Sequence, residues 1–128
     1  MTFVLLVTKA PFNTQNAYSA YCFAKALLLQ GKHCLKNIFF YCDGVYNANN
    51  NFIIKGRLSL TQLWIELSIK YSIELFICVK SLVQRGLECE KILYKQNENF
   101  MLINNNFKIT NLVTLTNFIL SCDRFVQF

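Results

Sequence analysis

Residues 74–87, ELFICVKSLVQRGL, contain the transition that decides the fold of this chain. The stretch opens with a short apolar run that ends near Cys78, and it continues with apolar residues at helical spacing. A continuous apolar run of this length is typical of a strand buried on both faces of a parallel sheet. The stretch therefore predicts a strand over 73–79, followed at once by helical material from 80 to about 95 with a break at Gly86.

The same alternation of strand and helix extends along the rest of the chain. Apolar runs predict strands at 3–7, 34–42, 107–109 and 124–128, and periodic segments predict helices at 15–30, 58–71 and 112–121. Asn13 or Thr14 is the expected cap of the first helix, and the asparagine-rich segment 43–56 is expected to be an irregular connection. We therefore expect one α/β domain over residues 1–128, with a flavodoxin-like, mainly parallel sheet of about five strands and helices on both faces.

The composition favours a folded domain outside the membrane. The chain has 128 residues, the size of one domain, and 54% hydrophobic residues are too many for a disordered protein. No apolar run approaches the ~20 residues of a membrane span, and the first residues lack the basic start and long apolar core of a signal peptide. We therefore expect a cytoplasmic protein. So apolar a domain is also expected to leave apolar surface exposed when alone, which suits a member of a complex.

The positive charge does not form a pattern typical of a nucleic-acid-binding surface. The net charge is +6, but the lysines and arginines are scattered along the chain without a basic run. We therefore expect the charge to serve general solubility rather than direct nucleic-acid binding, and attraction to an acidic protein partner stays open.

The six cysteines, at 22, 34, 42, 78, 89 and 122, are expected to be reduced thiols. The chain has no C-x-x-C pair and no Cys/His spacing typical of zinc, so neither a dithiol redox pair nor a bound metal is expected. Five of the six are expected to pack as small hydrophobic side chains.

Cys78 is the candidate for a reactive thiol. In an open parallel sheet, ligands bind at the carboxyl edge of the strands, where Cys78 is expected to lie. The start of the next helix favours the thiolate form, and Lys80 and Arg85 would add positive charge nearby. The alternative, that Cys78 is merely the last core residue of its strand, stays open at this point.

Cys42 is the rival thiol, since it also ends a predicted strand. Asp43 follows it directly, however, and a neighbouring carboxylate raises the pKa of a thiol. Cys22 is expected in the core near the apolar face of its helix. His33 is expected on the surface at the opposite edge of the sheet, where it could not pair with Cys78.

Other chemistries lack their motifs. The chain has no phosphate-binding loop, dinucleotide fingerprint or nucleophile elbow, and the loop at 8–16 is not a flavin phosphate cradle. The sequence therefore predicts a reactive thiol that works without a cofactor.

Three stretches together resemble the DsrE-like sulfur-relay family. They are FYCDGVYNAN at 40–49, ICVKSLVQRG at 77–86 and SCDRFVQF at 121–128, and the opening TKAPFNTQNAYSAYCFAKALL at 8–28 fits the same pattern. The likeness therefore spans essentially the whole chain. Lys80 and Ser81 depart from it, because the family pattern has small apolar residues there, and Cys42 stands where no thiol is expected.

The resemblance implies a sulfurtransferase in which Cys78 accepts sulfane sulfur as a persulfide. The sulfur would serve the 2-thiolation of wobble uridine in certain tRNAs. Implied partners are TusB-like and TusC-like subunits in a heterohexamer, a TusA-like donor and a TusE-like acceptor. Asn47 and Asn49 would border the site or act only as turn residues. The alternative function is a non-catalytic assembly subunit whose partner carries the active thiol.

Overall fold

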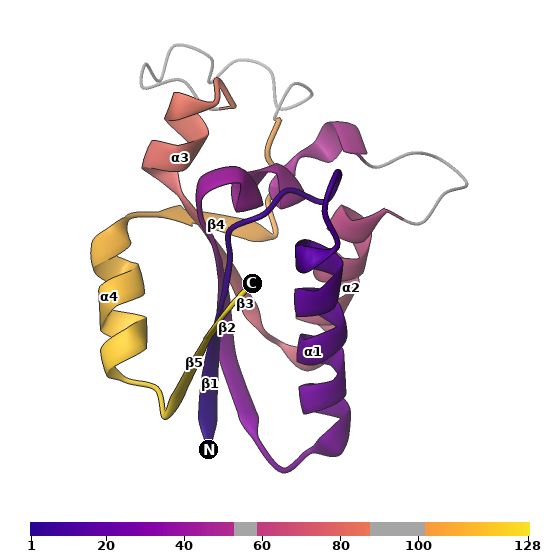
Figure 1. Cartoon of the computed structure of the whole chain (residues 1–128), viewed down its shortest axis with the longest axis vertical. Helices are drawn as coiled ribbons and strands as arrows, with labels where there is room; N and C mark the ends of the chain where they lie inside the picture. The colour runs from indigo at the N-terminus through magenta and orange to yellow at the C-terminus, as the bar shows by residue number, and fades with distance from the viewer. Residues whose placement is uncertain (53–58, 88–101) are drawn as a thin grey trace.

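The computed structural model describes residues 1–52, 59–87 and 102–128. The predicted alternation of strands and helices is confirmed (Figure 1). In chain order the elements are β1 (Thr2–Val7), α1 (Asn16–Gln30), β2 (Cys34–Phe40), the 3-10 helices η1 (Cys42–Ala48) and η2 (Asn50–Phe52), α2 (Leu60–Tyr71), β3 (Glu74–Cys78), α3 (Val79–Gln84), β4 (Phe107–Thr110), α4 (Leu112–Leu120) and β5 (Arg124–Gln127).

The strands form one parallel sheet in the order β4-β3-β2-β1-β5. The chain steps in one direction from β1 to β4, and β5 then returns to the other side of β1. Right-handed crossovers that run in opposite directions place their helices on opposite faces of a sheet. Accordingly, α1 and α2 cover one face and α4 the other (Figure 1). The predicted fold class, a parallel α/β sheet with helices on both faces, is confirmed.

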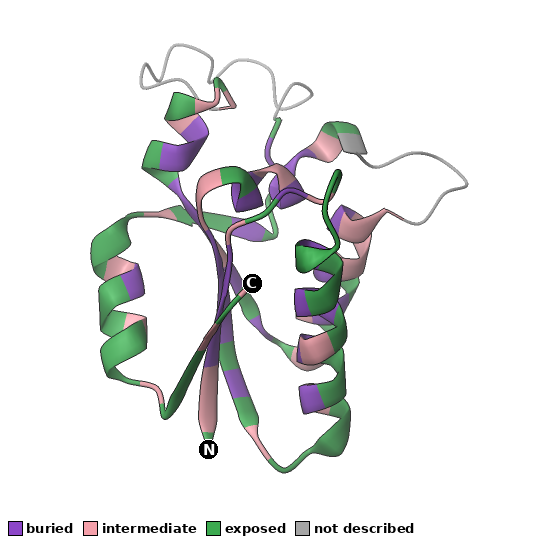
Figure 2. Ribbon diagram, in the orientation of Figure 1, coloured by how far each residue is buried: buried purple, intermediate pink, exposed green. Residues whose placement is uncertain are grey.

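The two faces of the sheet are covered unequally. The main core lies between the sheet and the helices α1 and α2, where the buried Trp64 packs edge-on against Phe40 and Tyr21, at ring-centroid distances of 5.3 Å and 5.5 Å. On the α4 face the buried cluster is much smaller. Figure 2 shows that most of α4 is exposed, whereas α1 and α2 turn buried residues towards the sheet. The α4 face is therefore only thinly covered.

Some element ends differ from the prediction. Neither Asn13 nor Thr14 caps α1; the helix begins after Gln15, which makes no capping hydrogen bond with its side chain. Asn13 instead adopts a left-handed conformation (φ 66°), which asparagine tolerates better than most residues because its short polar side chain can bond locally. The chain therefore enters the first turn of α1 directly after a bend in the preceding loop, without a side-chain cap.

The first part of the connection between β2 and α2, up to residue 52, is more regular than predicted. β2 ends at Phe40 rather than at residue 42, because the chain turns at Cys42 into the 3-10 helix η1. The described part of the connection therefore contains η1 and η2 where irregular structure was expected. After β3, helix α3 ends before the predicted break at Gly86, and the helical prediction for residues 88–95 falls outside the described residues.

The C-terminal segment is fastened to the start of β1 by Asp123. Its Oδ2 accepts hydrogen bonds from the backbone N–H and the hydroxyl of Thr2, at 2.7 Å and 2.8 Å. These bonds lower the pKa of Asp123 because they favour the ionised carboxylate. They also align β5 beside β1, so that the terminal segment SCDRFVQF completes the sheet.

Candidate functional site

Cys78 lies at the carboxyl edge of the sheet, as the sequence predicts. It is the last residue of β3 and immediately precedes α3. Its backbone is paired with Thr110 of the neighbouring strand β4. The side chain makes no capping hydrogen bond to α3, which is only six residues long. The thiol therefore sits at the start of a helix without being bonded to it.

The Cys78 side chain is fully buried on the α4 face. Side chains alternate along a strand, so Cys78 shares this face with Phe76, whereas Leu75 and Ile77 belong to the main core. Cys78 has an exposed fraction of 0% and lies in one cluster with Leu6, Phe39 and Leu115 of α4. Access from solvent thus requires a movement of this cover.

The expected exposure of the other thiols is wrong. Cys22 and Cys34 are exposed, and Cys42 and Cys122 are half-buried, whereas Cys89 lies outside the described residues. Cys22 follows the buried Tyr21, and one residue rotates a helix by about 100°, so its side chain leaves the buried stripe. Among the described cysteines, only Cys78 is buried.

The two positive charges expected near Cys78 differ in their surroundings. The Arg85 Nε donates to Asp43 Oδ1 at 2.8 Å, and its Nη1 donates to the Ser81 carbonyl at 3.2 Å. Arg85 thereby links α3 to η1, and Asp43 counters much of its charge. Lys80 is exposed on α3. Neither residue is bonded to the Cys78 thiol in the described structure.

Tyr41 connects the environments of two thiols. It packs against the cluster that contains Cys78, and Cys42 follows it in sequence. The pKa of Tyr41 is raised, first by negative charge on Cys42 and then by desolvation, a hydrogen bond to Cys42 and charge on Cys78. Arg85 acts in the opposite direction and lowers that pKa. The phenol therefore lies within electrostatic reach of both thiols.

Cys42 and Ser81 are in direct contact. The Cys42 backbone N–H donates to Ser81 Oγ at 3.1 Å, and Ser81 is buried in α3. A small apolar residue at position 81 could not accept this bond. The sequence could not indicate this contact, since nothing in it relates the two positions.

Asn47 has a structural place in the fold. It is fully buried, and its Nδ2 donates to the carbonyls of Lys9 and Gly44, at 3.1 Å and 2.8 Å. Its Oδ1 accepts from the Trp64 indole at 3.2 Å. Asn47 thus joins the loop after β1, η1 and α2. These contacts favour a structural role for Asn47 over a position at the border of the site.

Asn49 also bonds within its own connection. Its Oδ1 accepts from the backbone N–H of Asn51 at 2.8 Å, and its backbone bridges to Ile103. These two contacts of Asn49, with Asn51 and with Ile103, therefore fix the backbone of the connection that follows β2.

We expect Asn47→Ala to lower the free energy of unfolding by about 3 kcal/mol, because it removes the acceptor of the buried Trp64 indole N–H and two hydrogen bonds to backbone carbonyls. Urea unfolding followed by Trp64 fluorescence measures this loss. The exposed Asn51→Ala is the matched control and should change stability by less than about 0.5 kcal/mol. Equal stability of the two variants would contradict the structural role of Asn47.

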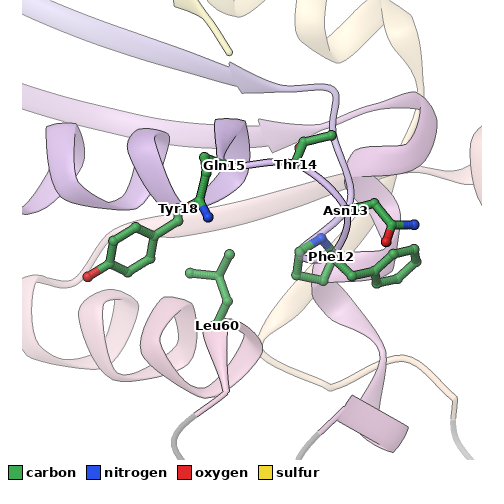
Figure 3. A pocket seen from close by; sticks show the side chains of 7 residues that line it. Phe12, Asn13, Thr14, Gln15, Tyr18 and Leu60 are labelled. Atoms are coloured by element: carbon green, nitrogen blue, oxygen red, sulfur yellow. The ribbon is translucent and has the colours of Figure 1, made fainter.

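A pocket of about 430 Å³ lies near the carboxyl edge of the sheet, beside α1 and α2 (Figure 3). It is lined by the loop 11–15, by Tyr18 of α1 and by Leu60 of α2. Cys78 projects from the other face of the sheet, so the pocket and the thiol are separate features.

Within residues 1–52, 59–87 and 102–128, no group of three His, Cys, Asp or Glu side chains could hold a metal ion. No helix in the same ranges is long and apolar enough to cross a membrane. His33 precedes β2 at the amino edge, where its ring packs against Phe3 at 5.5 Å.

The fold and the site define a small parallel α/β protein with a cysteine at the carboxyl end of an inner strand. Residues 1–128 match the DsrE/DsrF-like family throughout, and the chain belongs to this family. The predicted resemblance is thereby confirmed.

Similar proteins match over their full length. The protein named Sulfurtransferase TusD from Buchnera aphidicola subsp. Acyrthosiphon pisum (strain 5A) is 35% identical, with 100% of both chains covered. Sulfurtransferase TusD from Proteus mirabilis (strain HI4320) is 38% identical, over 100% of this chain and 98% of that protein. The crystal structure of the ychN protein from E. coli has the same fold, with a TM-score of 0.76 and 19% identity over 100% of both chains.

Proposed function

We infer that this chain is a sulfurtransferase that acts in a sulfur relay. Its family and its relatives support this function, since proteins 35% and 38% identical over essentially their full length are named Sulfurtransferase TusD. Residues 1–128 form one relay domain, and Cys78 carries the sulfur as a persulfide. The observation that carries this assignment is the position of Cys78 between β3 and α3, at the edge where parallel sheets bind ligands.

The transfer step needs only thiol chemistry. The Cys78 thiolate attacks the terminal sulfur of a persulfide on the donor, and the donor cysteine leaves as a thiolate. Cys78 then holds the persulfide until the thiolate of an acceptor attacks the same terminal sulfur and releases Cys78. Atoms and charge balance in both steps. The step therefore requires neither a cofactor nor an acid–base pair.

The burial of Cys78 suits a carrier of reactive sulfur. A persulfide that is exposed to small thiols would lose its sulfur to them, and the cover of the α4 face shields the site. That cover is slight, because Leu115 is the only buried residue of α4. Full burial of a leucine contributes about 1.5–3 kcal/mol, so the binding of a partner could offset the displacement of this side chain.

The outer side of α4 supports assembly with partner subunits. Val113 and Leu120 of α4 are exposed to 67% and 80%. Phe125 of the edge strand β5 is also exposed, and it lies on the α4 face because its register partner Val4 alternates with the main-core residue Leu5. Exposed apolar residues on one side of a protein mark an interaction surface. We propose that this surface meets TusB-like and TusC-like subunits in a heterohexamer. A TusA-like donor and a TusE-like acceptor then exchange sulfur with Cys78, for wobble-uridine thiolation of tRNA in the cytoplasm.

Loading with a persulfide donor tests the assignment of Cys78. Cys78 lies on the tryptic peptide 71–80 and is its only cysteine. After treatment with glutathione persulfide and alkylation, this peptide should carry one additional sulfur, about 32 Da. Additional sulfur on other cysteine peptides alone would reject Cys78 as the carrier. Peptide 109–124 contains Cys122, which lies at the opposite edge of the sheet, so the sulfur on this peptide measures non-specific loading in the same sample.

A further inference from the structure

Cys42 lies at the same end of the sheet as Cys78. Strands β2 and β3 are adjacent and parallel, with Phe40 opposite Ile77. The next residue of the first strand, Tyr41, therefore lies beside Cys78, and Cys42 follows directly. Since neighbouring strands lie about 4.8 Å apart, the register brings the two cysteines onto adjacent segments at one edge.

Contacts with α3 hold Cys42 in this place. Its backbone N–H donates to Ser81 Oγ at 3.1 Å, and Ser81 is the third residue of the helix that follows Cys78. The ion pair of Asp43 and Arg85, at 2.8 Å, fastens the next residue to the same helix. Cys42 also adopts a left-handed conformation (φ 52°), which is unfavourable for a residue with a Cβ and persists where its surroundings enforce it.

The two thiols differ in exposure in a way that suits a relay. Cys42 is half-buried and reaches the surface, whereas Cys78 is covered by the α4 cluster. The sequence ranks Cys42 below Cys78 because of the carboxylate of Asp43. That ranking assumed that the negative charge of Asp43 disfavours a thiolate at Cys42. In the structure the Asp43 carboxylate is paired with Arg85, so this argument against Cys42 is weaker.

We propose that Cys42 is a second sulfur-carrying thiol, which takes up sulfane sulfur at the surface and passes it to Cys78. This inference rests on the proposed role of Cys78 as the carrier. In the internal step the Cys78 thiolate attacks the terminal sulfur of the Cys42 persulfide. The bond between that sulfur and Cys42 Sγ breaks, a bond to Cys78 Sγ forms, and Cys42 leaves as a thiolate. The step conserves atoms and charge and consumes no oxidant.

Time-resolved loading tests this order, because each cysteine falls on its own tryptic peptide. Cys42 lies on peptide 37–55 and Cys78 on peptide 71–80. The protein is treated with glutathione persulfide and quenched with iodoacetamide at successive times. The additional sulfur should appear first on peptide 37–55 and then on peptide 71–80. In Cys42→Ser, loading of peptide 71–80 should slow by about tenfold or more, because the internal donor is lost.

Two further variants complete the test. In Cys78→Ser, peptide 37–55 should still take up sulfur and retain it. Cys122→Ser is the matched control, since this thiol is also half-buried but lies before β5 at the other edge, and it should behave like the wild type. Loading of Cys78 at the wild-type rate in Cys42→Ser would overturn the inference and leave the proposed function intact. If peptide 71–80 of the wild type never gained sulfur, the proposed function itself would fail.

A crosslink provides a readout that needs no substitution. Mild oxidation of the wild-type protein with diamide should join peptides 37–55 and 71–80 through a disulfide, because the internal transfer requires the two thiols to approach each other. If this linked pair did not form, the proposed exchange would be overturned.

Discussion

Replacement of Cys78 by serine should abolish sulfur transfer and leave the fold intact. A serine hydroxyl has no sulfur atom and cannot form a persulfide. The rate of sulfur transfer should therefore fall by at least about 10³-fold. The serine hydroxyl would lie among Leu6, Phe39 and Leu115, where an unpaired polar group destabilises by about 1–3 kcal/mol. Cys78→Ala avoids this penalty and should lose transfer equally. Agreement between the two variants separates the loss of the thiol from any effect on stability.

The same variants distinguish a sulfur carrier from an assembly subunit. The relay is reconstituted with TusB-like and TusC-like subunits, a TusA-like donor and a TusE-like acceptor, and 2-thiouridine in tRNA is measured. A carrier predicts that the complex of Cys78→Ala assembles, as seen by light scattering, but makes no 2-thiouridine. Thiolation at the wild-type level would favour the non-catalytic alternative. Cys22→Ser removes an exposed thiol of α1 and should have no effect on either readout.

Among the glycines that the structure describes, Gly44 should be the one whose replacement by alanine destabilises most. A Cβ at position 44 would lie 2.0 Å from the carbonyl oxygen and 2.8 Å from the carbonyl carbon of Val7. That carbonyl accepts a hydrogen bond from the Tyr41 N–H at 3.0 Å and belongs to an inner strand, so it cannot move aside without breaking the edge of the sheet. We therefore expect a loss of about 4 kcal/mol in the free energy of unfolding.

Gly31→Ala and Gly86→Ala are the controls for this substitution. At both positions nothing lies within 4 Å of an added Cβ, but φ is +63° and +68°. A residue with a Cβ in this region costs about 1–2 kcal/mol, and no steric overlap adds to it. Urea unfolding should therefore rank Gly44→Ala well below both controls. A Gly44→Ala protein as stable as Gly31→Ala would contradict the close packing of η1 on β1.

Much of the candidate site follows from local patterns in the sequence. The apolar run before Cys78 and the helical spacing after it each involve residues close in sequence, and both produce the predicted strand and helix. The alternation of such segments then leads to a parallel sheet, because its connections need helices to return the chain. For this reason the sequence alone determines the fold class and the place of Cys78 at the carboxyl edge.

Only the tertiary structure decides which thiols are exposed and which polar groups are paired. Cys78 is buried because Leu115 of α4, far along the chain, packs over it, and Arg85 is paired because η1 brings Asp43 to it. Asn47 becomes a buried link because Trp64 of α2 supplies a donor. Each of these outcomes depends on a partner distant in sequence. Local periodicity describes the shape of a segment, whereas burial and pairing depend on the segments that fold against it.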